Sequence, residues 1–344
     1  MCSYQGKFKP ALAHHLADCF SWPGDIVVDP FAGAGTIPFE ACRMGRVGIG
    51  FDISNLGYVL TRAKVMTAEP KKLKELLSEL EIQLCTQSPD DADIPNATAV
   101  RFNSSIPDFF HPETLREVLI ARRFFMDRWD SSPEWALAYA CTLHLLHGNR
   151  PYALSRRSHP VTPFKPTGPF EYRQLMPRLR AKILRTISEG PGPDFREGQV
   201  FLHDCTKRWP DSIPLADAII TSPPFFDSTR FYMTNWMRFW FAGWDRLDFD
   251  NKTGGFVENR QKSSLDVYRE FFEVARQRIK DNGVMVMHLG KSPKCDMGVE
   301  IASRVSPWFE VLDRFTEGVS HCESHGIRDK GTVVGHTYLI LIPA

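Results

Sequence analysis

Residues 221–226 have the sequence Thr-Ser-Pro-Pro-Phe-Phe and come directly after the apolar run Ala-Ile-Ile at 218–220. A short apolar run bounded by turn residues is typical of a buried strand, and this one ends at a corner stiffened by two prolines. The prolines fix two φ angles and remove two N–H donors, so the carbonyl groups of the corner point outward without strand partners. A serine hydroxyl and free carbonyls can accept the two hydrogens of an exocyclic amino group, while the aromatic ring stacks on the flat base that carries it. A strand-ending turn with core aromatics explains the stretch equally well when it is taken alone.

A second informative stretch, residues 25–36, has the sequence Asp-Ile-Val-Val-Asp-Pro-Phe-Ala-Gly-Ala-Gly-Thr. It predicts a strand, a glycine-rich turn and the start of a helix, where the backbone can approach a ligand closely. The spacing is not GxGxxG and there is no GK[ST], so phosphate binding is not the natural interpretation. A further predicted strand, 47–52, ends at Asp52, 17 residues after Gly35. An acid at that place can accept both hydroxyls of a ribose.

These stretches carry a resemblance to a known family. Residues 29–36 resemble the S-adenosylmethionine-binding motif DPFxGxGT of amino-methylating DNA methyltransferases, and residues 221–225 resemble their catalytic motif [TS]SPP[YF]. That form of the catalytic motif is the one most associated with the N4 amino group of cytosine. Residues 5–12, Gln-Gly-Lys-Phe-Lys-Pro-Ala-Leu, are similar to the segment that precedes the cofactor motif in the family. The three motifs cover roughly residues 5–60 and 200–290 and leave the middle of the chain unexplained.

The resemblance implies S-adenosyl-L-methionine as cofactor and a role for each motif residue. Asp52 is expected to hold the ribose and Asp204 the adenine amino group, although a helix cap or a surface acid explains Asp204 nearly as well. Lys9 is expected to pair with the cofactor carboxylate. The full set of expected cofactor-binding residues is Lys9, Pro10, Asp29, Pro30, Phe31, Gly33, Gly35, Thr36, Asp52, Asp204 and Thr221. The expected catalytic residues are Ser222, Pro223, Pro224 and Phe225, with Phe225 stacking on a base that has left the duplex.

The fold implied by the resemblance is α/β, a Rossmann-like class I methyltransferase sheet of seven strands. A large, mostly helical insertion is expected between the second and third strands. We predict a catalytic, cofactor-binding domain over 1–66 and 196–344 and an insertion over 67–195. Ligands bind at the carboxyl ends of the strands in such sheets, so both motifs should meet at that edge.

Periodicity and turn residues predict the remaining elements. Apolar residues at 73, 76, 77, 80 and 84 indicate an amphipathic helix over 71–84. Other helices are expected over 56–64, 112–130, 134–146, 178–188 and 264–280, the last ending at Asn282-Gly283, and one aromatic-rich helix over 226–244. Further strands are expected over 199–204, 284–288 and 332–342. Residues 88–96 are expected to form a surface loop, and the proline-rich stretch 150–177 an extended segment.

The insertion contains a basic segment. Between Arg150 and Arg185 there are nine Lys or Arg residues and one acid, Glu171, with aromatic residues interleaved. Such a segment suits phosphate contacts, and arginine can also bind guanine edges. We therefore expect residues 100–190 to recognise a DNA target; a solvated basic loop is the alternative. The expected DNA-binding residues are Arg150, Arg156, Arg157, His159 and Lys165.

Composition is consistent with a cytoplasmic enzyme. The 344 residues carry a net charge of +1 and contain no apolar run long enough to span a membrane, and no signal peptide is expected. The eight cysteines show no C-x-x-C pair, so reduced thiols and no metal are expected, with a Cys2–Cys19–Cys42 site as a remote alternative. No Pro-Cys dipeptide is present, which counts against methylation at cytosine C5, because that reaction needs a cysteine nucleophile.

The expected activity is transfer of a methyl group from S-adenosylmethionine to cytosine N4 in DNA. The expected partners are DNA, with the target base flipped from a duplex, and a cognate restriction endonuclease. An adenine-N6 DNA methyltransferase is an alternative, since it uses a related corner. An RNA guanine-N2 methyltransferase is another, since it has a similar DPFxGxGT; a separate RNA-binding domain is expected there, and the segment before Lys7 is too short for one. A non-catalytic nucleic-acid-binding relative is the least favoured.

Overall fold

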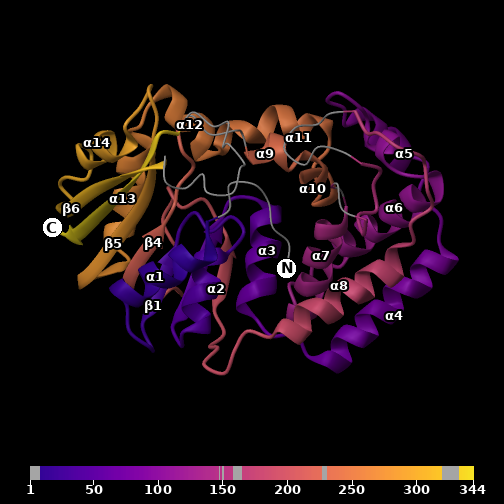
Figure 1. The fold of residues 1–344 in the computed structure, drawn as a ribbon, viewed down its shortest axis with the longest axis horizontal. Coiled ribbons are helices and arrows are strands. Elements are labelled where there is room, and N and C mark those ends of the chain that lie inside the picture. The colour runs from indigo at the N-terminus through magenta and orange to yellow at the C-terminus, as the bar shows by residue number, and fades with distance from the viewer. Residues whose placement is uncertain (1–7, 147, 149–150, 158–164, 227–230, 320–332) are drawn as a thin grey trace. The chain divides into compact units, whose positions relative to one another are not determined.

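The computed structural model describes residues 8–146, 148, 151–157, 165–226, 231–319 and 333–344 (Figure 1). The chain forms two compact units, and the described residues of each are as follows. The sheet unit contains 8–61, 192–226, 254–319 and 333–344. The helical unit contains 62–146, 148, 151–157, 165–191 and 231–253. The functional division of the chain at residues 66 and 196 stays a prediction; residues 231–253 belong structurally to the helical unit.

Seven strands among the described residues form one sheet, as the sequence predicts. They are β1 (Ile26–Asp29), β2 (Val47–Asp52), β3 (Gln199–Leu202), β4 (Ala216–Thr221), β5 (Ile279–Lys291), β6 (Phe309–Gly318) and β7 (Gly335–Pro343). Their order is β3-β2-β1-β4-β5-β7-β6. The first five strands pair in parallel, and β7 is antiparallel to both of its neighbours.

Helices cover both faces of this sheet because successive side chains of a strand point to opposite sides. Val27 and Val286 pack with α1 (Pro10–Phe20) and α2 (Thr36–Arg43) in one apolar cluster. Their neighbours Val28 and Met285 pack in a second cluster with α13 (Val267–Arg276) and α14 (Met297–Ala302). Strands β1 and β5 are therefore buried on both faces, which is the pattern of a parallel sheet, whereas β6 at the edge is mostly exposed.

The parallel register brings the two motifs to the same edge of the sheet. Val28 of β1 pairs with Ile219 of β4, so Asp29 and Thr221 lie at neighbouring strand ends. On the other side of β4, Thr221 pairs with Met287 of β5. The residues that follow these strands therefore meet at the carboxyl edge.

The helical unit is built mainly from the segment between β2 and β3, as Figure 1 shows. Its helices there are α4 (Pro70–Thr86), α5 (Asp93–Ala99), α6 (Pro112–Asp127), α7 (Pro133–Leu145) and α8 (Leu175–Glu189), and α3 (Asn55–Val65) leads into it from the sheet unit. In α4 the five residues predicted to be apolar and inward-facing are all buried. No described helix is both long and apolar enough to cross a membrane.

Three local predictions are wrong, each because a tertiary contact prevails over local preference. The loop expected over 88–96 contains the start of α5, where Arg123 pairs with both Asp90 and Asp93. The single helix expected over 226–244 is divided, in the part described, into α9 (Phe231–Thr234) and α10 (Trp236–Phe241). Its aromatic residues are nevertheless mostly buried, as expected.

The third correction concerns the helix expected over 264–280. Helix α13 ends at Arg276, and β5 already begins at Ile279, so Asn282-Gly283 lies inside a strand. Pairing with β4 causes this difference: Ala216 pairs with Ile279 and Ala218 with Val284, which leaves an irregularity in the register between them. Asn282-Gly283, which the sequence suggests as the end of a helix, instead lies at an irregularity of strand pairing. Strand β6 and helices α11 (Arg246–Asn251), α12 (Val257–Ser263) and α14 have no counterpart in the sequence predictions.

Candidate active site

A hydrogen bond joins the two motifs. Thr221 Oγ1 at the end of β4 donates to Asp29 Oδ1 at the end of β1, with 2.6 Å between the oxygens. Both side chains are buried, and burial raises the pKa of Asp29 to about 7, against the opposing effect of this bond and of the Phe31 N–H. Residues 192 positions apart are thereby coupled at one edge of the sheet.

The glycine-rich turn holds the carboxylate of Asp52. Gly33 N donates to Asp52 Oδ2 at 3.0 Å, and Ser54 donates to Oδ1 through its backbone N–H and its hydroxyl. Gly33 and Gly35 have φ angles of 52° and 68°, a conformation that glycine adopts without strain. Gly35 also lies against Thr61, since a Cβ there would be 2.7 Å from the Thr61 Cα. Burial raises the pKa of Asp52 to about 6, opposed by the hydrogen bonds from Ser54 and Gly33.

The remaining predicted cofactor residues differ in their surroundings. Asp204 Oδ1 accepts from the backbone and the hydroxyl of Thr206, and its Oδ2 lies 3.9 Å from Arg260. Phe31 packs against Tyr268 and Phe271 on the α13 side of the sheet, so its ring belongs to the core. Pro30 and Thr36 are buried at the turn and at the first residue of α2. Lys9 and Pro10 are exposed at the start of α1.

At the TSPPF corner, residues that the sequence did not reveal hold the backbone. Pro224 O accepts a hydrogen bond from Gln261 Nε2 at 3.0 Å, and Gln261 Oε1 accepts one from the Tyr268 hydroxyl at 2.9 Å. Gln261 and Tyr268 are both buried, on α12 and α13. No local sequence pattern indicates these two residues, because only the packing of α12 and α13 brings them to the corner.

The side chains of the corner lie against β5 and β7. Ser222 Oγ is 3.1 Å from His288 Nδ1, and Ser222 is half-buried. The Phe225 ring packs on Gly290, where a Cβ would be only 2.6 Å from the ring, and it also contacts His288 and His336. His288 is the last residue of the strand predicted over 284–288. Its place at the carboxyl end of that strand is the only sequence feature that could have suggested it as a site residue.

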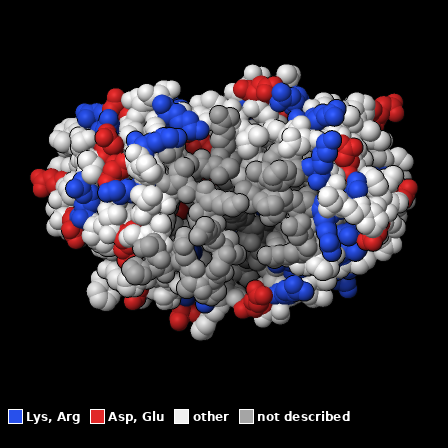
Figure 2. All heavy atoms as spheres, turned by 45° about the horizontal axis from the view of Figure 1, so that its top comes forward, with Lys and Arg blue, Asp and Glu red and all other residues white. Residues whose placement is uncertain are grey.

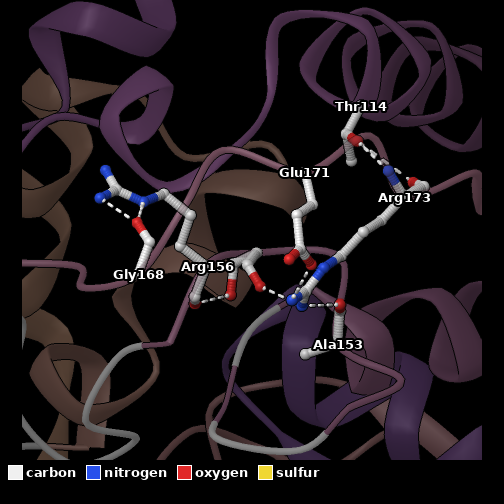
Figure 3. Close-up of polar contacts among 7 residues, drawn as sticks. Thr114, Ala153, Arg156, Gly168, Glu171 and Arg173 are labelled. Atoms are coloured by element: carbon white, nitrogen blue, oxygen red, sulfur yellow. Dashed lines mark hydrogen bonds and ion pairs between the residues drawn. The ribbon is translucent and has the colours of Figure 1, made fainter.

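The predicted DNA-binding residues of the basic segment are not all free to contact DNA, because some bind the protein and others are exposed (Figure 3). Arg156 donates through Nε and an Nη atom to Gly168 O, and its guanidinium lies 4.1 Å from the Phe170 ring centroid. Arg157 and Lys165 are exposed, and Arg157 O accepts from the backbone N–H of Thr167. Arg156 thus holds its own segment together. Arg150 and His159 lie outside the described residues.

Other cations of this segment also bind protein groups. Arg173 donates to the carbonyls of Ala153 and Ser155 and pairs with Glu171, and its backbone N–H donates to Thr114 Oγ1 (Figure 3). Figure 2 shows Lys and Arg mixed with Asp and Glu over one face of the molecule, with a column of basic side chains on the right of the view. The basic segment therefore contains many cations, and two of them, Arg156 and Arg173, bind carbonyl groups of the protein.

The sheet order, with its antiparallel β7 between β5 and β6, defines a Rossmann-like class I methyltransferase fold, as the sequence predicts. Residues 3–59 match the N6/N4 methyltransferase family model, described as DNA methylase. A curated relative, the Type II methyltransferase M.MjaII of Methanocaldococcus jannaschii, is 35% identical over 77 residues, which are 22% of this chain and 14% of that protein. Over this limited stretch the resemblance to amino-methylating methyltransferases is confirmed.

Solved structures with a similar chain path include TrmN from Thermus thermophilus, with a TM-score of 0.37 and 12% identity over 99% of this chain and 50% of that one. The rRNA methyltransferase aviRa from Streptomyces viridochromogenes also has a TM-score of 0.37 and 12% identity, over 99% of this chain and 88% of that one. Likeness at this level gives no information on the substrate.

The family match and the fold class support S-adenosylmethionine as the cofactor of this chain. The residues present fit it: Gly33 of the glycine turn bonds the half-buried carboxylate of Asp52, and Gly57 leaves room for that carboxylate, since a Cβ there would lie 2.1 Å from Asp52 Cγ. Among the described residues, no group of three or more His, Cys, Asp or Glu side chains is placed to hold a metal. Cys2, part of the alternative metal site, lies outside the described residues.

Proposed function

We propose that this protein transfers the methyl group of S-adenosylmethionine to an exocyclic amino group of a nucleic-acid base. The hydrogen bond between Thr221 and Asp29 carries the proposal, because it couples the TSPPF corner to the glycine-rich turn. A methyl donor bound at the turn and Asp52 would then have its reactive end near Ser222. The cofactor roles of Lys9, Asp52 and Asp204 belong to this proposal.

The chemistry requires geometry more than acid–base strength. When bound, S-adenosylmethionine supplies a methyl group on a positively charged sulfur that leaves as a neutral thioether. An exocyclic amino nitrogen is a poor nucleophile, because its lone pair is conjugated with the ring. Hydrogen bonds from the amino hydrogens to Ser222 Oγ and Pro223 O would favour a pyramidal nitrogen and direct its lone pair at the methyl group. The Phe225 ring, half-buried beside the corner, would stack on the base.

We favour cytosine N4 in DNA as the acceptor. Serine at position 222 matches the motif form associated with that atom, and the absence of a Pro-Cys dipeptide counts against cytosine C5. The N6/N4 family match supports an amino group and is equally compatible with adenine N6. Guanine N2 of RNA stays the third candidate, on the likeness of the DPFxGxGT motif alone.

The helical unit is proposed to recognise a double-stranded target, from which the base is flipped. Exposed Arg157 and Lys165 support contacts with phosphates, which supply most of the affinity of proteins for DNA. A cognate restriction endonuclease is a further proposed partner, because the curated relative is a Type II methyltransferase.

Mass spectrometry of nucleosides tests this proposal. DNA and RNA are each incubated with the full chain and S-adenosylmethionine, then digested and analysed. N4-methylcytosine in the DNA sample is expected. N6-methyladenine alone would favour the second candidate, and modified guanine in RNA alone would move the substrate to RNA. Calorimetry with S-adenosylmethionine separates an enzyme from a non-catalytic relative, since a chain without measurable cofactor affinity could only bind nucleic acid.

A further inference from the structure

His288 is a buried histidine that the proposed chemistry has not yet used. It lies on β5, one residue after Met287, which pairs with Thr221 of β4. The parallel register therefore places His288 beside Ser222, and the 3.1 Å between Ser222 Oγ and His288 Nδ1 is a hydrogen-bond distance. His288 is 7% exposed, whereas Ser222 is half-buried, so solvent reaches the serine more easily than the ring.

Packing holds the imidazole in one orientation. The His336 ring stacks on it with 4.8 Å between centroids, and Tyr338 and Phe8 contact it at 5.2 and 5.1 Å. A ring enclosed in this way cannot flip freely to place the Cδ2–H group where Nδ1 lies. Nδ1 is therefore the atom that faces Ser222.

The charge state of the ring follows from its surroundings. Burial, with smaller contributions from His336 and Lys9, lowers the pKa of His288 to about 3. The titratable groups that face it are His336 and Tyr338 from β7 and Lys9 from the start of α1. None of them is a carboxylate, so nothing among them favours the imidazolium, and the ring is neutral at neutral pH. A neutral imidazole has one nitrogen that accepts and one that donates.

We propose that His288 is a positioning residue whose Nδ1 accepts a hydrogen bond from the Ser222 hydroxyl and thereby leaves the Ser222 oxygen as an acceptor for the substrate. This proposal rests on the proposed function and deepens it. A serine hydroxyl that donates its hydrogen bond to His288 presents only lone pairs to the substrate, and an amino group can donate a hydrogen bond to them. If Nδ1 carried the proton instead, Ser222 would be free to point its own hydrogen at the substrate, which suits a carbonyl or ring nitrogen. The protonation state of His288 Nδ1 thus determines whether Ser222 binds a hydrogen-bond donor or a hydrogen-bond acceptor of the substrate.

Three substitutions at one position distinguish this role from simple packing. In Asn, Oδ1 is as many bonds from Cβ as Nδ1 is in His, so H288N keeps an acceptor near Ser222. H288Q carries the same amide one bond further out, and H288L carries no acceptor. We expect H288L and H288Q to lower kcat by about tenfold, the effect of losing one orienting hydrogen bond, with KM for S-adenosylmethionine nearly unchanged. H288N should retain clearly more activity than H288Q.

A double-mutant cycle shows whether the effect passes through Ser222. In the S222A background, H288L should cause no further loss of kcat, because the hydroxyl that it orients is already absent. Equal losses in H288N, H288Q and H288L, or losses that multiply with that of S222A, would overturn the proposal.

One measurement does not depend on the activity of any variant. In the full wild-type chain labelled with ¹⁵N-histidine, the Nδ1 signal of His288 should be that of a bare nitrogen, unchanged from about pH 5 to about pH 8. H288N assigns the signal by its disappearance. A protonated Nδ1 would overturn the inference even if the enzyme methylates amino groups. Conversely, absence of any methylated nucleoside would refute the proposed function while the nitrogen signal still decides the state of His288.

Discussion

The sheet unit and the helical unit use their polar side chains in opposite ways. In the sheet unit, Asp29, Asp52, Ser222 and His288 come from four separate strands or strand ends and meet through strand register. In the helical unit, the basic residues predicted to contact DNA belong to one stretch of the chain, and Arg156 and Arg173 of that stretch bind carbonyl groups of the same stretch. A regular sheet satisfies its own backbone, which leaves side chains at its edge for other purposes. An irregular segment first has to satisfy its carbonyl groups, and Arg156 and Arg173 do so here.

The largest effect is expected at the corner of the sheet unit. Ser222→Ala should lower kcat roughly 100-fold or more, since a positioned polar group in a reacting site contributes that much. Affinity for S-adenosylmethionine, measured by calorimetry, should change little. Thr206→Val is the matched control, since it removes a hydroxyl that bonds Asp204 at the predicted adenine end and should alter cofactor affinity more than kcat. A Ser222→Ala enzyme working at the wild-type rate would refute the proposed amino-group geometry.

The next effect concerns the bond between the two motifs. Thr221→Val preserves shape and removes the hydroxyl, so buried Asp29 loses one of its donors. We expect the free energy of unfolding to fall by about 1–3 kcal/mol in urea titrations. Thr98→Val, on an exposed position of α5, removes a hydroxyl that bonds only its own helix and should cost well under that. Equal costs for both variants would mean that the Asp29 contact contributes no special stability.

A smaller effect is expected in the helical unit. Arg157→Glu combined with Lys165→Glu should weaken binding to duplex DNA by about tenfold and reduce its dependence on salt concentration, as expected for lost phosphate contacts. Lys71→Glu combined with Lys74→Glu makes the same change of charge on exposed α4 positions. If both double variants bind DNA equally in a salt titration, the basic segment is not a specific contact surface. Arg156 is avoided because its substitution would disturb the segment itself.

The smallest effect is a pH dependence at Asp52. Its pKa of about 6 lies above the usual 3.8, so the folded protein holds this proton where the unfolded chain has lost it. The contribution of Asp52 to stability is therefore greatest below pH 3.8 and falls as the pH rises through 6. Cofactor affinity should change in the opposite sense and increase a few-fold through about pH 6, because an ionised carboxylate accepts ribose hydroxyls better than a protonated one.

Calorimetry between about pH 5 and about pH 8 measures this dependence. Asp52→Asn is the control, since its amide does not titrate and its affinity should be lower and should lack the increase through about pH 6. Wild-type affinity that is equally flat would show that Asp52 ionises in its ordinary range or does not contact the ribose.

Strands with strong local signals were predictable. The predicted bounds of the strand Val47–Asp52 agree with the structure, because an apolar run that ends in an acid is typical of a buried strand in a parallel sheet. The amphipathic spacing of α4 likewise specified its buried face. The predictions for Asn282-Gly283 and for the aromatic segment 226–244 are wrong, because contacts distant in the sequence act on both. Asn282-Gly283 lies in the strand that pairs with β4, and Arg238 of α10 donates a hydrogen bond to Leu143 O of α7, 95 positions away.

The sequence by itself determined the class of fold and the candidate ligand chemistry, because glycine turns, strand-ending acids and the proline corner are local features whose meaning depends on few neighbours. Only the tertiary structure decided which groups hold that corner. His288, Gln261 and Tyr268 lie 66, 37 and 7 positions from their partners, and strand register and helix packing bring each of them into contact. Such contacts depend on the packing of many residues together, so they cannot be predicted from any single residue of the sequence.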